Sequence, residues 1–224
     1  MLPARRAQLK SRDNSVQPVD LMWARAINIL ASIQEILIVH GKPNSSWVTF
    51  ALLFLTLYIL DASVASANWV ETPSLGTVTF ISMIVAVLLS RRRSHPVFLH
   101  ATGLLTWGIV TIVFSTALIE PVQDSSPFNE LFTRLRVWLD AAFSGGINND
   151  TLPFGVILIA AAWIISYASA WFVFRTGNVW GGVLPSGLAI LTNLSYLPSR
   201  FFIFFFLYVL MALLLIVWMH SLKR

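Results

Sequence analysis

Asp61 is the residue whose position most suggests chemistry, because it interrupts the apolar stretch LYILDASVA. A carboxylate inside a membrane span is costly, and it commonly marks a proton or cation pathway or pairs with a buried arginine. The alternative is that Asp61 lies toward one end of its span and is hydrogen-bonded to Ser63, Ser66 or a neighbouring helix. Because no second charge lies within a span, the sequence favours this alternative.

Asn193 is a second polar candidate, in the stretch WGGVLPSGLAILTNLSYLP. Its glycines and Pro185 are compatible with a broken helix of the kind that lines binding sites in transporters. They are equally typical of helices that pack closely against each other. No inverted repeat is recognisable in the sequence, so we expect close packing.

Several classes of reaction are excluded by what the sequence lacks. It contains no cysteine, which rules out thiol nucleophiles, Cys–zinc sites and iron–sulfur clusters within it. The four histidines lie near the ends of apolar segments, where a haem or metal site between spans is not expected. No Ser-His-Asp arrangement is evident either. We therefore expect neither a catalytic residue nor a cofactor in this chain.

The composition indicates an integral membrane protein. Of the 224 residues, 57% are hydrophobic and 11% are charged, whereas soluble domains carry about 25% charged residues. The apolar residues form long blocks, and about 20 helical residues cross a bilayer. The sequence thus predicts an all-α, polytopic transmembrane bundle of about six spans. The expected spans are 48–70, 74–90, 97–119, 154–174, 179–197 and 201–220, of which 74–90 and 179–197 are the shortest or most polar.

The basic residues predict the orientation of the bundle. Arg91, Arg92 and Arg93 follow the second expected span, and runs of arginine are retained on the cytoplasmic side. Both chain ends then lie inside, together with twelve of the fifteen basic residues, while six of the ten acids lie outside. We expect a multi-pass protein of the plasma membrane, whose positive charge reflects topology and not nucleic-acid binding.

Two further segments are expected to be amphipathic helices lying in the membrane interface. One is 20–40, on the cytoplasmic side, although a seventh span remains an alternative there. The other is 128–143, whose apolar residues share one face. The stretch SGGINNDTLP that follows is expected to end this helix at Gly145–Gly146 and to cap the next one with Asp150 or Thr151.

The chain therefore divides into four parts: a basic N-terminal segment with its interfacial helix (1–46), three spans (47–119), an extracytoplasmic loop (120–153), and three spans with a short basic tail (154–224). Within the loop, Arg134, Arg136 and Trp138 are the candidate docking residues for a partner. Contact of the two arginines with lipid headgroups is an equally weighted alternative.

The stretches SVASANWVETPSLGTVTFISMIVAVLLSRRRSHPVFLHATGLLTWGIVTIVF and RLRVWLDAAFSGGINNDTLPFGVILIAAAWIISYASAWFVFRTGNVWGGVLPSGLAILTNLSY carry a resemblance. The chain resembles, over about residues 60–222, the amino-terminal multi-span region of bacterial membrane-anchored transglutaminase-like proteins. The resemblance implies a following extracytoplasmic domain with a Cys-His-Asp triad. This chain ends at Arg224 without any cysteine, so no catalytic residue is carried over. We expect it to be the membrane half of such a protein, as a fragment, a truncated gene product or a free-standing relative.

The leading functional hypothesis is a non-catalytic membrane domain, in contact with the lipid bilayer, that anchors or positions an extracytoplasmic transglutaminase-like enzyme or another protein partner. One alternative is a small transporter or channel subunit that uses Asp61. Another is an accessory subunit of a larger membrane complex.

Overall fold

A computed structural model describes residues 43–120 and 126–222. The chain divides into two compact units, 1–46 and 47–224. The expected helix at 20–40 lies outside the described residues. The described elements are all helical: α2 (Pro43–Ala67), α3 (Leu75–Ser90), α4 (Pro96–Thr116), α5 (Pro127–Ser144), α6 (Leu152–Thr176), α7 (Val179–Ser195), the 3-10 turn η1 (Ser199–Phe201) and α8 (Phe202–Ser221).

Four segments of the described chain are helical, long and apolar enough to cross a membrane. They are Trp47–Ala67, Pro96–Thr116, Leu152–Thr176 and Ser199–Ser221. The prediction of an all-α fold with membrane-spanning helices agrees with this architecture. The six expected spans are present as helices, but α3 and α7 have only 16 and 17 residues. They are shorter than the roughly 20 residues that a bilayer core requires.

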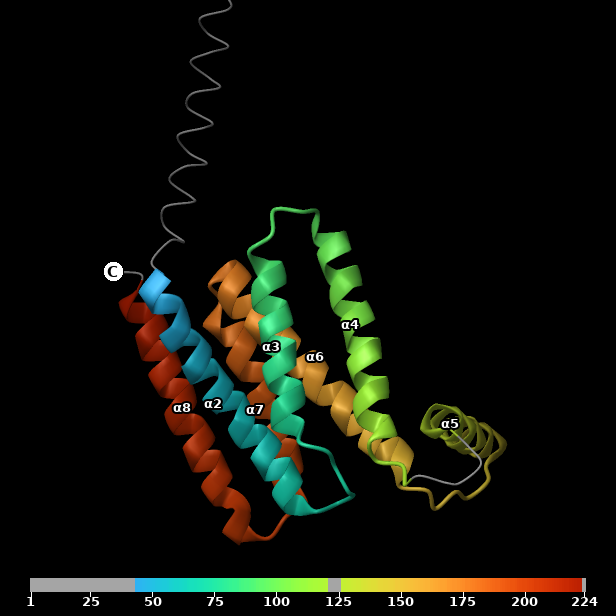
Figure 1. Ribbon diagram of the computed structural model, residues 1–224. Coiled ribbons are helices and arrows are strands. Elements are labelled where there is room, and N and C mark those ends of the chain that lie inside the picture. The colour runs from blue at the N-terminus through green and yellow to red at the C-terminus, as the bar shows by residue number, and fades with distance from the viewer. Residues whose placement is uncertain (1–42, 121–125, 223–224) are drawn as a thin grey trace, which may run out of the picture. The chain divides into compact units, whose positions relative to one another are not determined.

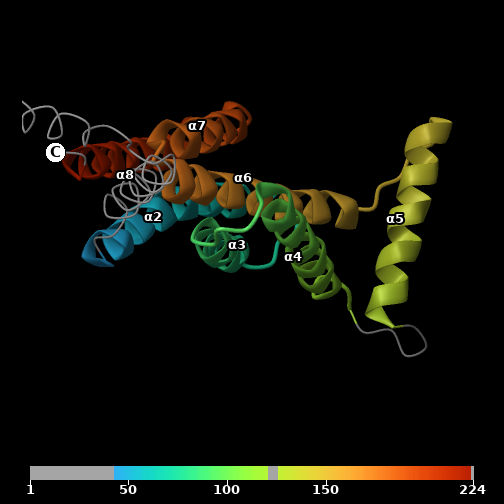
Figure 2. The ribbon, with the colours of Figure 1, turned by 90° about the horizontal axis from the view of Figure 1, so that it is seen from above.

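Helix α6 occupies the middle of the bundle, where it contacts α3, α4 and α7. Helix α8 packs against α7, and α2 lies beside α3, where the rings of Phe50 and Phe54 meet Phe80 edge-on. Helix α5 contacts α4 and α6 at one end of the bundle and runs across their direction (Figures 1 and 2). The described unit is therefore a bundle of apolar helices with one helix lying across an end.

Hydroxyl groups link the spans through the core. Ser82 of α3 donates to the carbonyl of Trp163 on α6 at 3.0 Å, and Ser169 of α6 donates to the carbonyl of Gly182 on α7 at 3.0 Å. Gly182 has no side chain, and a Cβ there would meet Val173 at 3.0 Å. Small residues and serines are the usual means by which helices approach closely in a membrane.

Helix α7 is continuous through Pro185. Proline lacks the amide hydrogen that would bond the carbonyl four residues earlier, here that of Gly181, so the helix loses one backbone hydrogen bond at Pro185. Side chains of neighbouring helices can hydrogen-bond other groups of such a turn in a membrane helix. Here Tyr208 of α8 donates to the carbonyl of Val183 at 2.5 Å and also hydrogen-bonds Ser186 at 2.8 Å. The glycine- and proline-rich stretch is thus a packed helix and not an interrupted one.

Candidate functional site

Two polar residues selected from the sequence, Asp61 and Asn193, line the same cavity. The cavity has a volume of about 620 Å³ and lies among α2, α6 and α7, with Leu75 of α3 and Trp69 completing its wall. Most of its wall is apolar, and Pro185 is part of it. Because the two residues are 132 positions apart, only the packing of the helices brings them together.

The carboxyl group of Asp61 is buried without a charged partner. Its residue is only 5% exposed, and Thr79 of α3 supplies a side-chain hydrogen bond. The second carboxyl oxygen, Oδ2, has no hydrogen-bond partner within the part of the chain that the structure describes. Nor does any described Lys, Arg or His line the cavity. Asp61 is therefore a buried carboxylate whose hydrogen-bonding capacity is not used up.

Asn193 joins α2 and α7 beside the cavity. Its amide nitrogen donates to the hydroxyl of Ser63 at 2.9 Å, and its amide oxygen accepts from Trp69 Nε1 at 3.3 Å. The Trp69 ring also meets the Tyr196 ring edge-on, with 6.4 Å between centroids. Both aromatic residues line the cavity and are exposed, so they form an aromatic rim on it.

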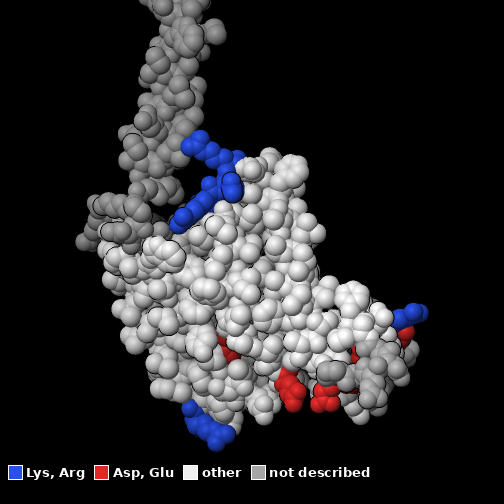
Figure 3. Space-filling model, in the orientation of Figure 1, with Lys and Arg blue, Asp and Glu red and all other residues white. Residues whose placement is uncertain are grey.

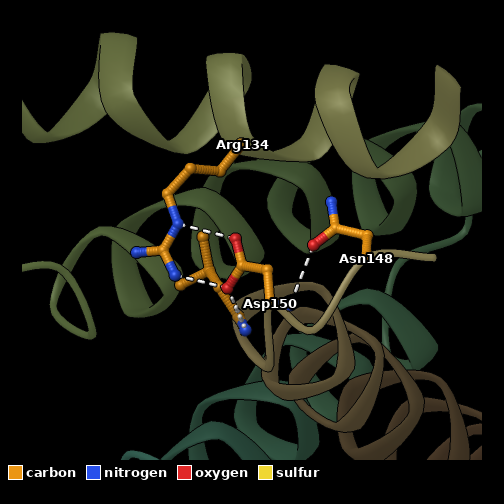
Figure 4. Close-up of polar contacts among 4 residues, drawn as sticks. Arg134, Asn148 and Asp150 are labelled. Atoms are coloured by element: carbon orange, nitrogen blue, oxygen red, sulfur yellow. Dashed lines mark hydrogen bonds and ion pairs between the residues drawn. The ribbon is translucent and has the colours of Figure 1, made fainter. Parts of the chain in front are cut away.

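The loop between α5 and α6 is organised by Asp150 (Figure 4). Arg134 of α5 donates from Nε to Asp150 Oδ2 at 2.7 Å, and its Nη2 forms a second bond to Oδ1. Asp150 Oδ1 also accepts from the amide of Leu152 at 3.0 Å, while the Asp150 amide donates to Asn148. Of the two expected caps, Asp150 and not Thr151 provides the capping side chain.

Electrostatic interactions between Arg134 and Asp150 stabilise the junction of α5 and α6. The hydrogen bonds from Arg134 lower the pKa of Asp150 below its ordinary value, and the bond from the Leu152 amide acts in the same direction. The same pair raises the pKa of Arg134. Beneath it, Leu131 is fully buried and packs with Ile119 and Leu152. Arg134, a candidate docking residue, is thus engaged in holding α5 to α6.

The rest of α5 is turned outward. Arg136 is exposed and lies 3.9 Å from Asp140 on the same helix, and Trp138 is half-buried. Large apolar side chains of this helix are also exposed, the most exposed being Phe143 at 90%. Gly145 ends the helix in the left-handed conformation, with φ at 73°. A helix with this exposure presents a surface and does not complete the core.

Arg175, at the end of α6, was not among the candidates from the sequence. Its guanidinium donates to the carbonyls of Ser90 and Arg92 at 2.7 and 2.8 Å, where α3 ends. It also lies 5.7 Å from the centroid of the Trp171 ring. The only signal in the sequence is a single arginine directly after a long apolar run, which does not identify its partner.

The described residues include no group of three His, Asp or Glu side chains that could hold a metal ion. The arrangement can instead place a buried carboxylate against a ligand in the cavity, and it can present α5 to a partner or to the membrane surface. Comparisons with family models, curated protein sequences and solved structures return no match for this chain.

Proposed function

We propose that this chain is a non-catalytic, multi-pass domain of the plasma membrane that positions an extracytoplasmic transglutaminase-like enzyme or partner. The observation that carries the proposal is α5, a helix that contacts the bundle through the Arg134–Asp150 pair and the buried Leu131 while most of its described residues are exposed. The resemblance of the sequence to the membrane region of transglutaminase-like proteins supplies the kind of partner.

The proposal includes six spans with both chain ends in the cytoplasm. Helices α3 and α7 would be about 24 and 26 Å long at 1.5 Å per residue, against a hydrocarbon core of about 30 Å. Local thinning of the bilayer accommodates short spans at modest cost. Both are packed against α6, which supports their membership of the bundle.

The distribution of charge supports the orientation. Arg91, Arg92 and Arg93 lie where α3 joins α4, and Figure 3 shows basic side chains at this end of the bundle. Acidic side chains gather toward the opposite end and around α5 (Figure 3). Glu71 and Glu120 line one hollow there, of about 750 Å³. By the positive-inside rule, this distribution supports the proposed orientation, with the arginines inside and α5 outside.

The orientation predicts the labelling of introduced cysteines, for which a chain without native cysteine is well suited. Ser144→Cys, at the end of α5, should react in intact cells with a maleimide that cannot cross the membrane. Ser94→Cys, between α3 and α4, should react only after the membrane is permeabilised. Both serines are exposed, so accessibility within the protein is matched. Labelling of Ser94→Cys in intact cells would overturn the orientation.

The docking role predicts a specific cross-link from α5. A photoreactive benzoylphenylalanine in place of Phe143 should, on irradiation in native membranes, attach to a protein segment from an extracytoplasmic domain with a Cys-His-Asp triad. Mass spectrometry of the cross-linked peptide identifies it. The control places the same group at Val113, an exposed residue within α4, where lipid adducts are expected. If Phe143 also yields only lipid adducts, α5 is a membrane-surface helix and the docking role is wrong.

A further inference from the structure

The cavity beside Asp61 has the size and lining of a ligand site. Sites for small molecules usually measure about 300–1,000 Å³ and are mostly apolar, with a few polar groups that fix orientation. This cavity measures about 620 Å³. Leu60, Val64, Leu158 and Ile165 contribute to its apolar wall, so an apolar chain or ring would be accommodated there.

The polar end of the ligand is defined by Asp61. A buried carboxylate is stable only when it is paired or fully hydrogen-bonded. Asp61 Oδ2 is buried and has no such partner among the described residues, and Asp61 is one of the residues that line the cavity. A positively charged donor in the cavity would be attracted to this carboxylate, whereas an anionic headgroup would be repelled.

The residues at the rim of the cavity also favour a positively charged ligand. The aromatic residues Trp69 and Tyr196 line the cavity there, together with the polar residues Asn193 and Thr192. Aromatic faces attract ammonium groups. The absence of a lining Lys, Arg or His in this described cavity removes any competing positive charge.

The depth of Asp61 suits a ligand that enters from the membrane interface. Asp61 lies six residues before the end of α2 at Ala67, which is about 9 Å along the helix. Leu188, also on the cavity wall, is 68% exposed. The cavity wall is therefore open toward the side of α7, where an alkyl chain would continue into the bilayer.

We infer that this cavity binds an amphiphile with a primary ammonium headgroup and an alkyl chain. The ammonium group donates to Asp61, and the chain lies along the apolar wall. This site is separate from the surface of α5 and does not depend on the proposed docking function.

Native mass spectrometry of the full chain, released from a neutral detergent, tests the inference with dodecylamine as the probe. We expect one saturable adduct per chain. Dodecanol, with the same chain and no charge, should bind at least tenfold more weakly. Asp61→Asn should weaken dodecylamine binding at least tenfold, and Asp140→Asn, which removes an exposed carboxylate of α5, should leave it unchanged.

A second variant protects the test against misfolding of Asp61→Asn. Ala161→Phe places a ring in the cavity wall and keeps Asp61, so it should also lower dodecylamine binding at least tenfold. The fold of each variant is checked by circular dichroism and by its thermal unfolding midpoint. Equal binding of dodecanol and dodecylamine, or undiminished binding in folded Asp61→Asn or Ala161→Phe, would overturn the inference.

Discussion

Replacing Arg175 with Gln is expected to destabilise the bundle by about 2–4 kcal/mol. Its two hydrogen bonds would contribute about 1.5–3 kcal/mol each, and we expect less than their sum because Arg175 is only half-buried. The guanidinium donates to two carbonyls at the end of α3, at 2.7 and 2.8 Å. The last carbonyls of a helix lack partners within the helix, and they carry the negative end of its dipole. The positive charge of Arg175, which belongs to α6, therefore offsets the partial negative charge at the C-terminal end of α3.

Thermal unfolding in a mild detergent measures this effect. For a chain of this size, 1 kcal/mol corresponds to roughly 2–4 °C in the unfolding midpoint, so Arg175→Gln should lower it by several degrees. Arg175→Lys should have an intermediate effect, because an ammonium group keeps the charge but not the planar fork that reaches two carbonyls.

Arg200→Gln is the matched control. Arg200 lies over the Phe201 ring at 5.0 Å and donates to no group in the described ranges, so its loss should change the midpoint little. Equal midpoints for the two Gln variants would contradict the capping role.

The positions of the helices follow closely from the sequence. The expected span at 154–174 is α6, Leu152–Thr176, and the expected flat helix at 128–143 is α5, Pro127–Ser144. Both have strong local signals, because Pro127 and Pro153 favour helix starts and Gly145 and Gly177 end helices in the left-handed conformation. Local signals of this kind depend only on neighbouring residues, so a single sequence is sufficient to place the elements.

The candidate site depends on contacts that no local pattern encodes. Asp61 and Asn193 are separate candidates in the sequence, and they share a cavity because residues of α2, α6 and α7 together form its wall. Ser186 and Tyr208 were not selected at all, since a serine in a span is often satisfied within its own helix. Indeed Ser186 also bonds the carbonyl of Gly182 one turn earlier. The sequence therefore predicts which residues are unusual but not which of them meet.

The junction at Arg134 illustrates the same limit. Arg134 lies on the face of α5 opposite its apolar residues, and this position predicts a role at the surface, in docking or in contact with lipid. The structure pairs it instead with Asp150, the residue that caps α6. A sixteen-residue separation across a turn allows many pairings, and the actual one occurs beside a cluster in which Leu131 packs with Ile119 and Leu152.

Breaking the pair between Arg134 and Asp150 should release α5 from the bundle without unfolding the spans. The pair is bidentate, which favours a strong interaction, but the Arg134 side chain is 35% exposed, so solvent weakens it. We expect Arg134→Gln to cost about 2 kcal/mol of docking energy, which raises the undocked fraction of α5 about thirtyfold. Arg136→Gln, two residues along the same helix, removes an equal charge from an exposed pair at 3.9 Å and should have little effect.

Spin labels on introduced cysteines at Ala117, after α4, and Thr133, on α5, measure this release as a broadened distance distribution.

The contribution of the Arg134–Asp150 pair to docking depends on pH in a direction that can be predicted. Because the pKa of Asp150 is lowered in the folded protein, the pair contributes fully above the ordinary aspartate pKa of about 3.9. Its contribution is lost as the pH falls from there through the lowered folded value. The distribution should therefore stay narrow near neutral pH and broaden only in strong acid, whereas Arg134→Gln and Asp150→Ala should broaden it at neutral pH. If α5 positions an extracytoplasmic partner, the same two variants should also lower the yield of the cross-link from Phe143. A distribution unchanged by Arg134→Gln would mean that Leu131 and its apolar neighbours alone hold α5 in place.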